Sequence, residues 1–502
     1  MHHLARHRLA PVAALATTLL AIAPATTPAA PKPRSVPADA AVVSVSNAAF
    51  GSPIPAGFLG LSLENDAVIP YAGADPKALN PVFLQLVRNL APDTSPVLRI
   101  GGDSTDWAWY PVPGLTKPRG VRVTLTRRWL AVTHALASDL SARLILGVDL
   151  EADSRAAADG EASAFERGIG NPWIEALELG NEPNLYGTLT WFVQPDGVHV
   201  FGRPSGYGFS SFLGEFTSFA QGLPGPLAGP ATGSASWLGV VGQFLAAEPR
   251  VRLATVHAYP VQSCDLRPSS PIFPSVAHLL APQATTGLAD MVAPAVAAAH
   301  ARHLPVRVDE MNTDSCGFAP GVSDAFVSAL WALNALFEMA RVGVDGVNIH
   351  TYPGATYQLF TFSRSRHGWT ASVAPEYYGL DMFAQAAPAG ARLVATTTTN
   401  AQGITVWATR GRLGRTRVLL INESPDRRTV ALSSASGRPA TLELLSAPSL
   451  TSTTGVTLGG QSFGNRTATG RLAGRSHVAQ LSATGGRYVF TLPAESAALV
   501  TF

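Results

Sequence analysis

The sequence is poor in lysine, and its positive charge is almost entirely arginine. Only Lys32, Lys77 and Lys117 are lysines among 502 residues. The formal net charge is +2, and no basic stripe is present, which argues against nucleic-acid binding. With 46% hydrophobic and 14% charged residues, the composition is that of a globular protein, long enough for one large domain and one smaller one.

Cysteine is scarce too, since Cys264 and Cys316 are the only two. In an exported chain they can form one disulfide, and two unpaired buried thiols are the alternative. No compact ligand spacing surrounds the cysteines or His257, so no metal site is expected. Dinucleotide fingerprints, phosphate loops and zinc-binding helix motifs are also missing, so we expect no cofactor.

Long apolar runs are missing after the N-terminal segment. Residues 1–30 begin with a basic stretch, continue with an Ala/Leu segment, and offer small residues for cleavage near Ala25 or Ala30. The alternative is a membrane anchor, but Pro11 and Pro24 bracket an apolar stretch shorter than the roughly 20 residues of a span. We therefore expect a signal peptide, secretion to the extracellular space, and no membrane association.

Residues 57–388 show eight apolar runs that alternate with helical or loop segments. The runs cover residues 58–66, 97–106, 143–150, 176–184, 227–233, 251–260, 306–312 and 346–354. The fifth run has the weakest pattern. Eight strands that alternate with helices predict an α/β fold, a (β/α)8 TIM barrel.

The residues outside this region have a different character. Residues 389–502 contain short β-branched runs separated by Gly, Ser and Asn, which predict a C-terminal antiparallel β-sandwich. Residues 31–40 are rich in Pro and Ala and are predicted to be a linker. Residues 41–56 are predicted to supply an N-terminal strand to the sandwich. The sandwich lacks a group of titratable residues, so we expect it to support the barrel or to contact sugar.

Polar side chains crowd the C-terminal ends of six of the eight predicted strands. They are Glu64, Asp103, Glu182, His257 with Tyr259, Glu310, and His350 with Tyr352. Active sites of (β/α)8 barrels occupy this rim. Turn formation would explain an Asp or an Asn at a strand end, but it does not explain the Glu, His and Tyr residues.

Two of these carboxylates suit glycoside hydrolysis. Glu182 ends the fourth predicted strand and Glu310 the seventh, so both should face the barrel mouth from opposite sides. The reaction needs one carboxylic acid to protonate the leaving oxygen and a second, ionised one to attack the anomeric carbon or activate water. We expect Tyr259 to donate to Glu310 and keep it ionised, and Asn181 to hold a sugar hydroxyl.

The segments ELGNEPN, HAYP and VDEMN resemble the retaining (β/α)8 glycosidases. More closely, VLRIGGDSTD and residues 314–357 are similar to glycoside hydrolase family 79, the β-glucuronidases and heparanases. This similarity covers the barrel and, more loosely, the sandwich. It implies Glu182 as acid/base, Glu310 as nucleophile and Asn181 as the contact of the 2-hydroxyl group.

The resemblance also implies the residues that hold the sugar being released. Glu64 and Asp103 match positions that contact its hydroxyl groups, and the alternative for both is an ion pair with Arg99. Tyr357 and the backbone at Gly317 match positions that contact the carboxylate of a uronic acid.

One position departs from the family pattern. Many relatives have a tyrosine that helps bind the carboxylate where this chain has Ser315, which leaves the uronate specificity open. Arg267 or Arg364 is a possible substitute, although each is more commonly a solvated loop charge. If the loops after the sixth and seventh strands are neighbours, a disulfide between Cys264 and Cys316 would brace them around the nucleophile.

The expected function is therefore a secreted retaining β-glycosidase, an exo-acting β-glucuronidase that releases glucuronic acid through a covalent glycosyl-enzyme intermediate. The expected partner is a carbohydrate, a β-glucuronide or glycan. Two alternatives remain: a glycosidase of the same fold for a neutral sugar, and a catalytically silent exported sugar-binding protein. Heparanase-like internal cleavage is less favoured, because the motif loops contain few arginines.

Overall fold

The computed structural model describes residues 36–264, 267–433 and 437–502. The predicted signal peptide and the first half of the predicted linker, residues 31–35, lie outside these residues. In the part that is described, no helix has the length and apolar character needed to cross a bilayer.

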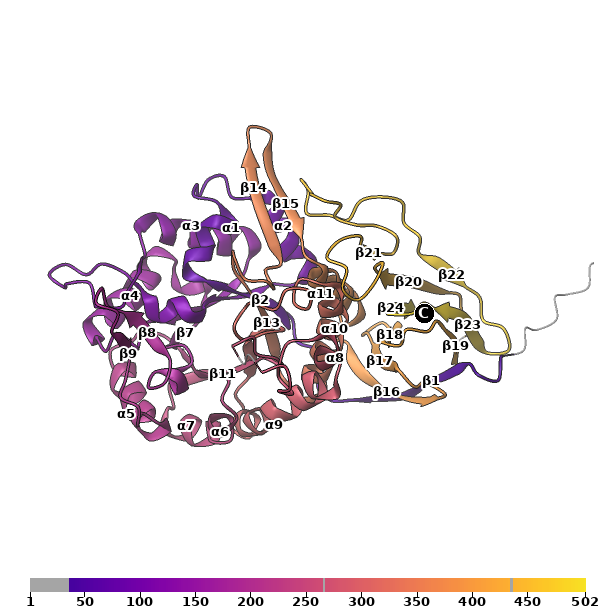
Figure 1. The fold of residues 1–502 in the computed structure, drawn as a ribbon, viewed down its shortest axis with the longest axis horizontal. Coiled ribbons are helices and arrows are strands. Elements are labelled where there is room, and N and C mark those ends of the chain that lie inside the picture. Colours follow the sequence, from indigo (N-terminus) through magenta and orange to yellow (C-terminus); the bar gives the residue numbers. More distant parts are fainter. Residues whose placement is uncertain (1–35, 265–266, 434–436) are drawn as a thin grey trace, which may run out of the picture. The chain divides into compact units, whose positions relative to one another are not determined.

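Eight parallel strands close into a barrel in the order β10–β11–β12–β13–β2–β3–β6–β7, and helices surround it (Figure 1). The barrel strands are β2 (Leu59–Glu64), β3 (Val97–Gly101), β6 (Arg143–Val148), β7 (Ile174–Leu179), β10 (Leu227–Thr232), β11 (Val251–Ala258), β12 (Val306–Met311) and β13 (Gly346–Thr351). Each lies within or overlaps one of the eight predicted runs, so the (β/α)8 prediction is confirmed.

All eight barrel strands end before the predicted runs do, and two of them, β3 and β7, end five residues earlier. Residues 102–106 belong to a 3₁₀ helix, and residues 180–182 form a turn that leads into another. In both places a glycine takes the chain out of the strand, because Gly102 has φ +70° and Gly180 has φ +80°. These turns carry Asp103, Asn181 and Glu182 into the barrel mouth.

The longer helices lie outside the barrel and bury their apolar faces against it. They are α2 (Pro81–Leu90), α3 (Arg127–Leu140), α4 (Arg155–Gly168), α5 (Phe209–Ala220), α7 (Val241–Ala247), α9 (Thr286–His300), α10 (Phe326–Val342) and α11 (Pro375–Ala386). Local sequence fixes their ends. The Thr126 side chain, for example, accepts a hydrogen bond from the backbone N–H of Trp129 at 3.1 Å and so caps the start of α3.

Short elements complete the loops around the barrel. The short helices are α1 (Val68–Ala72), α6 (Ala235–Leu238), α8 (Val276–Leu279) and the 3₁₀ helices η1 (Asn65–Ala67), η2 (Gly102–Trp107), η3 (Asn171–Trp173), η4 (Pro183–Leu185) and η5 (Pro282–Ala284). The short strand pairs are β4 (Ala108–Trp109) with β5 (Val123–Thr124), β8 (Thr190–Val193) with β9 (His199–Phe201), and β14 (Phe360–Ser365) with β15 (Gly368–Val373).

The C-terminal domain is a ten-stranded sheet in the order β21–β20–β24–β18–β17–β16–β1–β19–β23, with β22 beside β20. Its strands are β1 (Ala41–Phe50), β16 (Arg392–Thr399), β17 (Ile404–Arg410), β18 (Thr416–Asn422), β19 (Arg428–Ser433), β20 (Ala440–Ser446), β21 (Thr457–Leu458), β22 (Ala479–Leu481), β23 (Arg487–Leu492) and β24 (Ser496–Thr501). Alternate residues of β18 and β19, such as Val418 and Val430, pack into one apolar cluster with residues of β1, β16, β17, β20, β23 and β24.

This domain differs from the predicted antiparallel arrangement in one strand pair. β1 runs antiparallel to β16 but parallel to β19. The two neighbours of β1, β16 and β19, run in opposite directions to each other. A strand between them is therefore antiparallel to one and parallel to the other. The sheet is therefore mixed, and its N-terminal strand comes from the far end of the chain.

The sheet packs against the barrel through α10 and α11. Phe337 of α10 stacks on Trp407 of β17 with ring centroids 5.4 Å apart and planes at 12°. The indole N–H of Trp407 donates to the side-chain oxygen of Asn334 at 3.0 Å. Leu419 and Leu499 of the sheet belong to the same apolar core as the barrel residues, so the C-terminal domain stabilises the barrel from the β13 side.

Candidate active site

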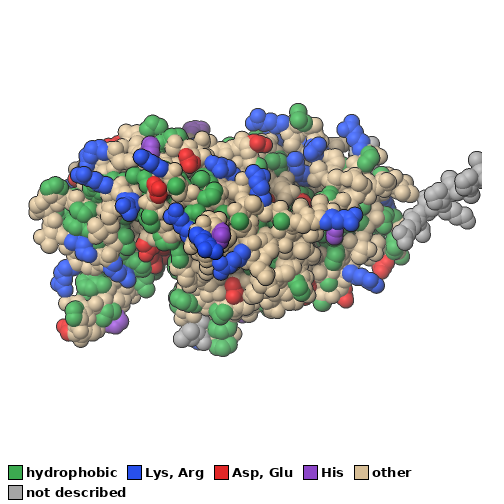
Figure 2. All heavy atoms as spheres, turned by 90° about the horizontal axis from the view of Figure 1, so that it is seen from above, with side chains coloured by type: hydrophobic (Ala, Val, Ile, Leu, Met, Phe, Trp, Pro, Cys, Tyr) green, Lys and Arg blue, Asp and Glu red, His purple; other side chains and the backbone are tan. Residues whose placement is uncertain are grey.

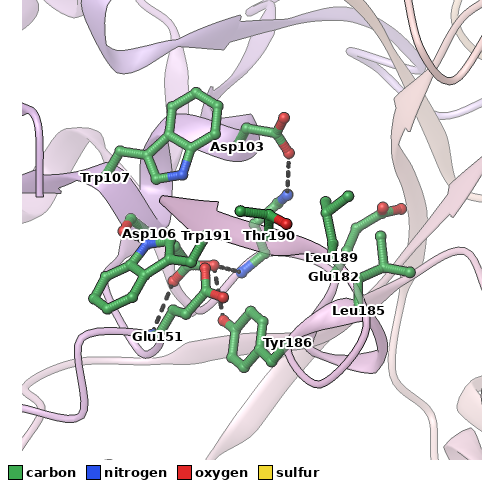
Figure 3. A pocket seen from close by; sticks show the side chains of 11 residues that line it. Asp103, Asp106, Trp107, Glu151, Glu182, Leu185, Tyr186, Leu189, Thr190 and Trp191 are labelled. Carbon is green, nitrogen blue, oxygen red and sulfur yellow. Dashed lines mark hydrogen bonds between the residues drawn. The ribbon is translucent and has the colours of Figure 1, made fainter. Parts of the chain in front are cut away.

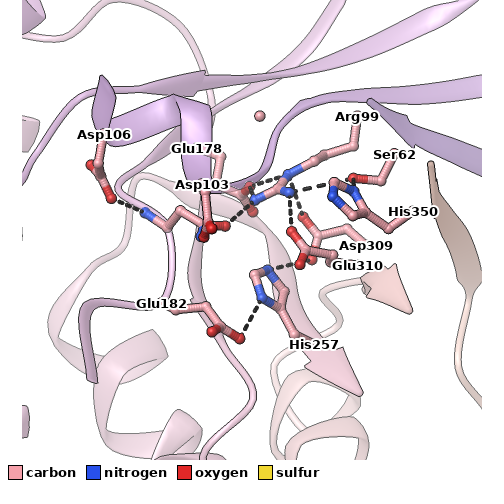
Figure 4. Close-up of polar contacts among 12 residues, drawn as sticks. Ser62, Arg99, Asp103, Asp106, Glu178, Glu182, His257, Asp309, Glu310 and His350 are labelled. Carbon is pink, nitrogen blue, oxygen red and sulfur yellow. Dashed lines mark hydrogen bonds and ion pairs between the residues drawn. The ribbon is translucent and has the colours of Figure 1, made fainter. Parts of the chain in front are cut away.

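Glu182 lies at the barrel mouth, directly after β7, in a left-handed backbone conformation with φ 45°. Its backbone N–H donates to the carbonyl oxygen of Ala231 at 2.9 Å. The side chain is 23% exposed, and its Oε1 lies 3.0 Å from Nδ1 of His257 (Figure 4). Glu182 therefore has one ordered partner and keeps access to solvent, as an acid/base group requires.

Glu310 is the fifth residue of β12 and is buried. Its Oε2 accepts from Nη1 of Arg99 at 2.5 Å, and its Oε1 accepts from the hydroxyl of Tyr259 at 2.8 Å. Burial by itself raises the pKa of Glu310, but His350, His257, Arg99 and the Tyr259 hydrogen bond outweigh burial and lower this pKa below its ordinary value. The expected contact from Tyr259 is present, and Glu310 is held as an anion.

His257 lies between the two glutamates. It is a Cα partner of Glu310 in the β11–β12 pairing, and its ring contacts Glu182 on one side. On the other side its Nε2 lies 3.7 Å from Oδ1 of Asp309. A buried imidazole therefore connects the environment of Glu182 with the carboxylates beneath Glu310 (Figure 4).

Arg99 of β3 lies at the centre of these buried carboxylates. Its guanidinium group lies 2.8 Å from Glu178, 2.5 Å from Glu310 and 3.8 Å from Asp309. It also donates to the side-chain oxygen of Asn181 at 2.8 Å and so orients that amide. Among the described residues, no ion pair joins Arg99 to Glu64 or Asp103, so this alternative for the two acids is wrong: Glu178 and Glu310 occupy the positions around the guanidinium.

The two carboxylates Glu178 and Asp309, which lie beside Arg99, differ in protonation. Burial disfavours the charge of Glu178, but Arg99 outweighs it, and the pKa of Glu178 is lowered. The pKa of Asp309 is raised well above its ordinary value, first by burial and then by the charge of Glu178. Of the three carboxylates beside Arg99, Glu178 and Glu310 have lowered pKa values and only Asp309 has a raised one, so Asp309 keeps a proton to the highest pH.

Glu64 and Asp103 lie together on the other side of the mouth. Glu64 accepts from the backbone N–H groups of Asp103 and Ser104 at 3.2 and 2.8 Å, and its Oε1 lies 3.3 Å from Nε2 of His350. Oδ1 of Asp103 accepts from the Asn181 amide at 3.3 Å. Asp103 is exposed at the open mouth, where its carboxyl can form a hydrogen bond with a sugar hydroxyl.

Gly317 and Tyr357 are brought together, as the resemblance implied. A Cβ atom on Gly317 would lie 3.0 Å from the Tyr352 hydroxyl and 3.7 Å from the Tyr357 ring. The rings of Tyr352 and Tyr357 are 5.9 Å apart at 86°. The Gly317 N–H donates to the carbonyl oxygen of Asp314 in a long bond of 3.3 Å.

Two hollows open on either side of Glu182. The first, of about 350 Å³, is lined by Asp103, Asp106, Trp107, Asn181, Glu151 and Trp191 among others (Figure 3). The second, of about 920 Å³, is lined by Tyr259, Gln262 and Ser315 among others. No Lys or Arg is among the described residues that line either hollow. Arg364 lies on β14 instead, with its guanidinium 5.5 Å from the centre of the Trp369 ring.

Asp106 and Glu151 were not expected in the site. Asp106 accepts from the backbone N–H groups of Leu150, Glu151 and Asn181 at 3.0 to 3.2 Å and from the Tyr186 hydroxyl at 2.8 Å. It thereby holds the ends of two barrel strands together. Burial and then the charge of Asp106 raise the pKa of Glu151 to about 9. Glu151 follows the third predicted strand, so its place at the rim was a usable signal.

Cys264 and Cys316 form the expected disulfide, with Cα atoms 5.9 Å apart. It joins the loops that follow β11 and β12. Asp314 strengthens the same junction, because its side chain accepts from the backbone N–H of Ser263 at 2.6 Å and from that of Phe318 at 2.8 Å. In the described ranges, no group of three or more His, Cys, Asp or Glu residues has the arrangement of a metal site.

The fold and the sequence comparisons support a glycoside hydrolase. Residues 397–499 match the family described as glycosyl hydrolase family 79 C-terminal beta domain. The resemblance to family 79 is thereby confirmed, through the C-terminal domain. No curated protein sequence is significantly similar to the chain.

Solved structures with the same fold include several glycosidases. A 4-O-α-L-rhamnosyl-β-D-glucuronidase from Fusarium oxysporum is 22% identical with a TM-score of 0.68, and the match covers 92% of this chain and 100% of that chain. A family 51 arabinofuranosidase from Xanthomonas axonopodis pv. citri is 14% identical with a TM-score of 0.63, covering 92% and 99%. At these identities the likeness shows the barrel and its C-terminal domain.

Proposed function

We propose that this protein is a secreted, retaining, exo-acting β-glucuronidase, with Glu310 as nucleophile and Glu182 as acid/base. The observation that carries the proposal is the contrast between the two carboxylates. Glu310 is buried and held as an anion by Arg99 and Tyr259, whereas Glu182 is partly exposed and has a single ordered partner, His257. Two carboxylates with such different surroundings suit two different roles.

In the first step, an oxygen of Glu310 attacks the anomeric carbon and forms a covalent ester. The bond between this carbon and the leaving oxygen breaks, and Glu182 gives its proton to that oxygen. Arg99 and Tyr259 hold Glu310 in place for the attack. Glu182 ends the step ionised, next to His257.

In the second step, water attacks the anomeric carbon of the ester. Glu182 takes a proton from the water, and Glu310 leaves as a carboxylate. Arg99 and Tyr259 then donate to the charge that returns to Glu310. Arg99 and Tyr259 therefore stabilise Glu310 both when it attacks and when it leaves.

We assign contacts of the sugar from the same geometry. Asn181, oriented by Arg99 and Asp103, donates to or accepts from the 2-hydroxyl group, and Glu64 and Asp103 contact further hydroxyls. Tyr357 and Gly317, with Tyr352, contact the uronate carboxylate. The choice of glucuronide is supported by the family 79 domain and by the glucuronidase among the structures of the same fold.

A neutral sugar is the second candidate substrate. The hollows beside Glu182 have several acidic residues and no Lys or Arg among their described lining, which favours an uncharged ligand. Ser315, where relatives have a tyrosine, is exposed at the second hollow. A silent sugar-binding protein is the third candidate, and the ordered pair of carboxylates argues against it.

The test is hydrolysis of p-nitrophenyl β-glycosides by wild type, Glu310→Gly and Glu182→Ala. The panel contains the glucuronide, galactoside, glucoside and xyloside. We expect selective release from the glucuronide, with the β-anomer formed first in proton NMR spectra. Azide should restore turnover of both variants, giving the α-glycosyl azide with Glu310→Gly and the β-glycosyl azide with Glu182→Ala.

Each other outcome rejects a specific part of the proposal. Turnover of a neutral glycoside instead would reject the substrate, and an α-anomer formed first would reject retention. Unchanged activity of Glu310→Gly would reject the nucleophile. Wild type that binds these sugars but cleaves none of them would favour the silent binding protein.

A further inference from the structure

The small net charge of the chain conceals an uneven distribution. Residues 389–502 contain twelve arginines and four acidic residues, whereas residues 36–388 contain twenty basic and thirty acidic residues. The C-terminal domain therefore has a formal charge of +8 and the preceding part −10. Such an asymmetry indicates that the two parts attract different ligands.

The acidic residues are also less visible at the surface than their number suggests. The whole chain has 36 basic and 34 acidic residues. On the face drawn in Figure 2, however, Lys and Arg side chains cover more of the surface than Asp and Glu side chains. Many acids are buried, such as Glu178 and Asp309 in the barrel strands and Glu376 in α11. The C-terminal domain has only four acids, Glu423, Asp426, Glu443 and Glu495, at least partly exposed, and they offset a third of the charge of its twelve arginines.

Part of this charge surrounds an open hollow of about 1700 Å³ beside the turn between β17 and β18. Its charged lining residues are all arginines: Arg412, Arg415, Arg417 and Arg438. A second hollow of about 680 Å³ shares Gly414 and Phe502 with the first and adds Arg410. None of the described residues that line either hollow has an acidic side chain. We call the two hollows together the arginine groove.

Arg410 of this groove is engaged by backbone carbonyl groups, whereas Arg412, Arg415 and Arg417 form no ion pair within the described residues. The Arg410 guanidinium donates to the carbonyl oxygens of Ser46 and Asn47 at 3.0 Å each. The arginine ion pairs of the described residues belong to the barrel. Burial and then the like charge of Arg415 lower the pKa of Arg417. A carboxylate placed among these three would relieve that repulsion.

We propose that the arginine groove binds an acidic polysaccharide, a chain of uronate sugars, at a site separate from the barrel mouth. Guanidinium groups pair with carboxylates through two parallel hydrogen bonds, and several arginines along one groove suit a ligand with repeated carboxylates. Phe502, the last residue, adds an apolar surface between the two hollows for a sugar ring.

The choice of a polysaccharide over another polyanion rests on the proposed function. A glycosidase that cuts single sugars from chain ends gains from a second site that keeps the polymer close, because the local concentration of ends rises. The groove itself requires only a polyanion.

The test compares two variants with equal loss of charge. The groove variant is Arg412→Gln, Arg415→Gln and Arg417→Gln together. The control is Arg427→Gln, Arg466→Gln and Arg475→Gln, three exposed arginines of the same domain that line neither hollow. Binding of sodium polygalacturonate is measured by isothermal titration calorimetry at about 20 mM and about 200 mM NaCl, with dextran as the neutral polymer.

We expect wild type to bind polygalacturonate and not dextran, with affinity that falls as salt rises. The groove variant should bind at least about tenfold more weakly at low salt, and the control variant less than about threefold more weakly. Both should cleave the p-nitrophenyl glycoside that wild type cleaves at unchanged rates, because this small substrate does not reach the groove and the substitutions lie outside the barrel mouth.

Four results would overturn this proposal: no binding by wild type, equal losses in the two variants, binding of dextran, or tighter binding of a double-stranded DNA at the same salt. Equal losses would mean that diffuse charge, and not the groove, attracts the polymer. Failure of glycoside hydrolysis with groove-dependent binding intact would reject the proposed function alone.

Discussion

The substitution Asp309→Asn should stabilise the protein at neutral pH. Asp309 is buried, and both of its oxygens, with Oε1 of Glu178, lack a hydrogen-bond partner when the two carboxyls are ionised. A proton on Asp309 supplies the missing bond, because the two side chains lie within hydrogen-bond reach. The introduced amide would offer a donor in a side chain of the same shape, without having to take up a proton on folding.

The size of the expected stabilisation follows from the proton that Asp309 keeps in the folded state. An aspartate in the unfolded chain titrates near pH 3.9, while the pKa of Asp309 in the folded state is raised well above that value. Between these two pKa values the folded state binds one more proton than the unfolded state, so wild-type stability falls by about 1.4 kcal/mol per pH unit as pH rises. From pH 4 to pH 7 the Asn variant should therefore gain at most about 4 kcal/mol relative to wild type.

The assay is urea unfolding of both proteins at pH 4, 5.5 and 7. The difference in the free energy of unfolding should be small at pH 4 and should grow with pH in favour of the variant. Glu178→Gln is the control, because its pKa is lowered and it pairs with Arg99 at 2.8 Å. It should cost roughly 3–5 kcal/mol at neutral pH. An Asp309→Asn variant that is less stable than wild type at pH 7, or whose difference does not change with pH, would refute the assigned proton.

Two further predictions concern the nucleophile and the disulfide. Tyr259→Phe removes the hydrogen bond at 2.8 Å to Glu310, which is worth about 1.5–3 kcal/mol for a charged acceptor. The pKa of Glu310 should rise by roughly one to two units, so the acid limb of kcat/KM should move to higher pH. Because this pKa starts well below its ordinary value, the profile is measured from about pH 2 upward, and an unchanged acid limb would contradict the assigned contact. Cys264→Ser with Cys316→Ser opens a loop of 52 residues and should lower the free energy of unfolding by about 4 kcal/mol, whereas an unchanged melting temperature would show that the bridge contributes nothing.

The barrel could be predicted from sequence because its signal is local and repeated. Each strand is a short apolar run that ends in turn residues, and even the weakest, β10, lies where expected. The clustering of polar residues at the strand ends also located the mouth. The parallel pairing of β1 with β19 could not be predicted, because it depends on which neighbours the folded sheet offers to a strand from the opposite end of the chain.

The contacts of Arg99 show which part of the site could not be predicted from the sequence. Its sequence neighbours indicate a buried strand, but its partners Glu178, Asn181 and Glu310 come from two other strands and the turn after one of them. Which of several nearby acids pairs with one arginine depends on side-chain directions across the closed barrel, and sequence spacing does not contain them. For the same reason Asp106, which binds three backbone N–H groups, was not distinguishable from an ordinary turn residue.

The end of β7 explains why an apolar strand stops on an Asn-Glu pair. Gly180, with φ +80°, turns the chain, and a Cβ there would lie 2.5 Å from the Tyr186 hydroxyl. Glu182 then adopts φ 45°, which costs about 1 kcal/mol or more for a residue other than glycine. The bonds from its N–H to Ala231 and from Asn181 to Asp106 offset that cost. The strain is thus what turns the Glu182 side chain from the barrel wall toward His257, and Glu182→Gly or Glu182→Asn would relieve the backbone while removing the acid.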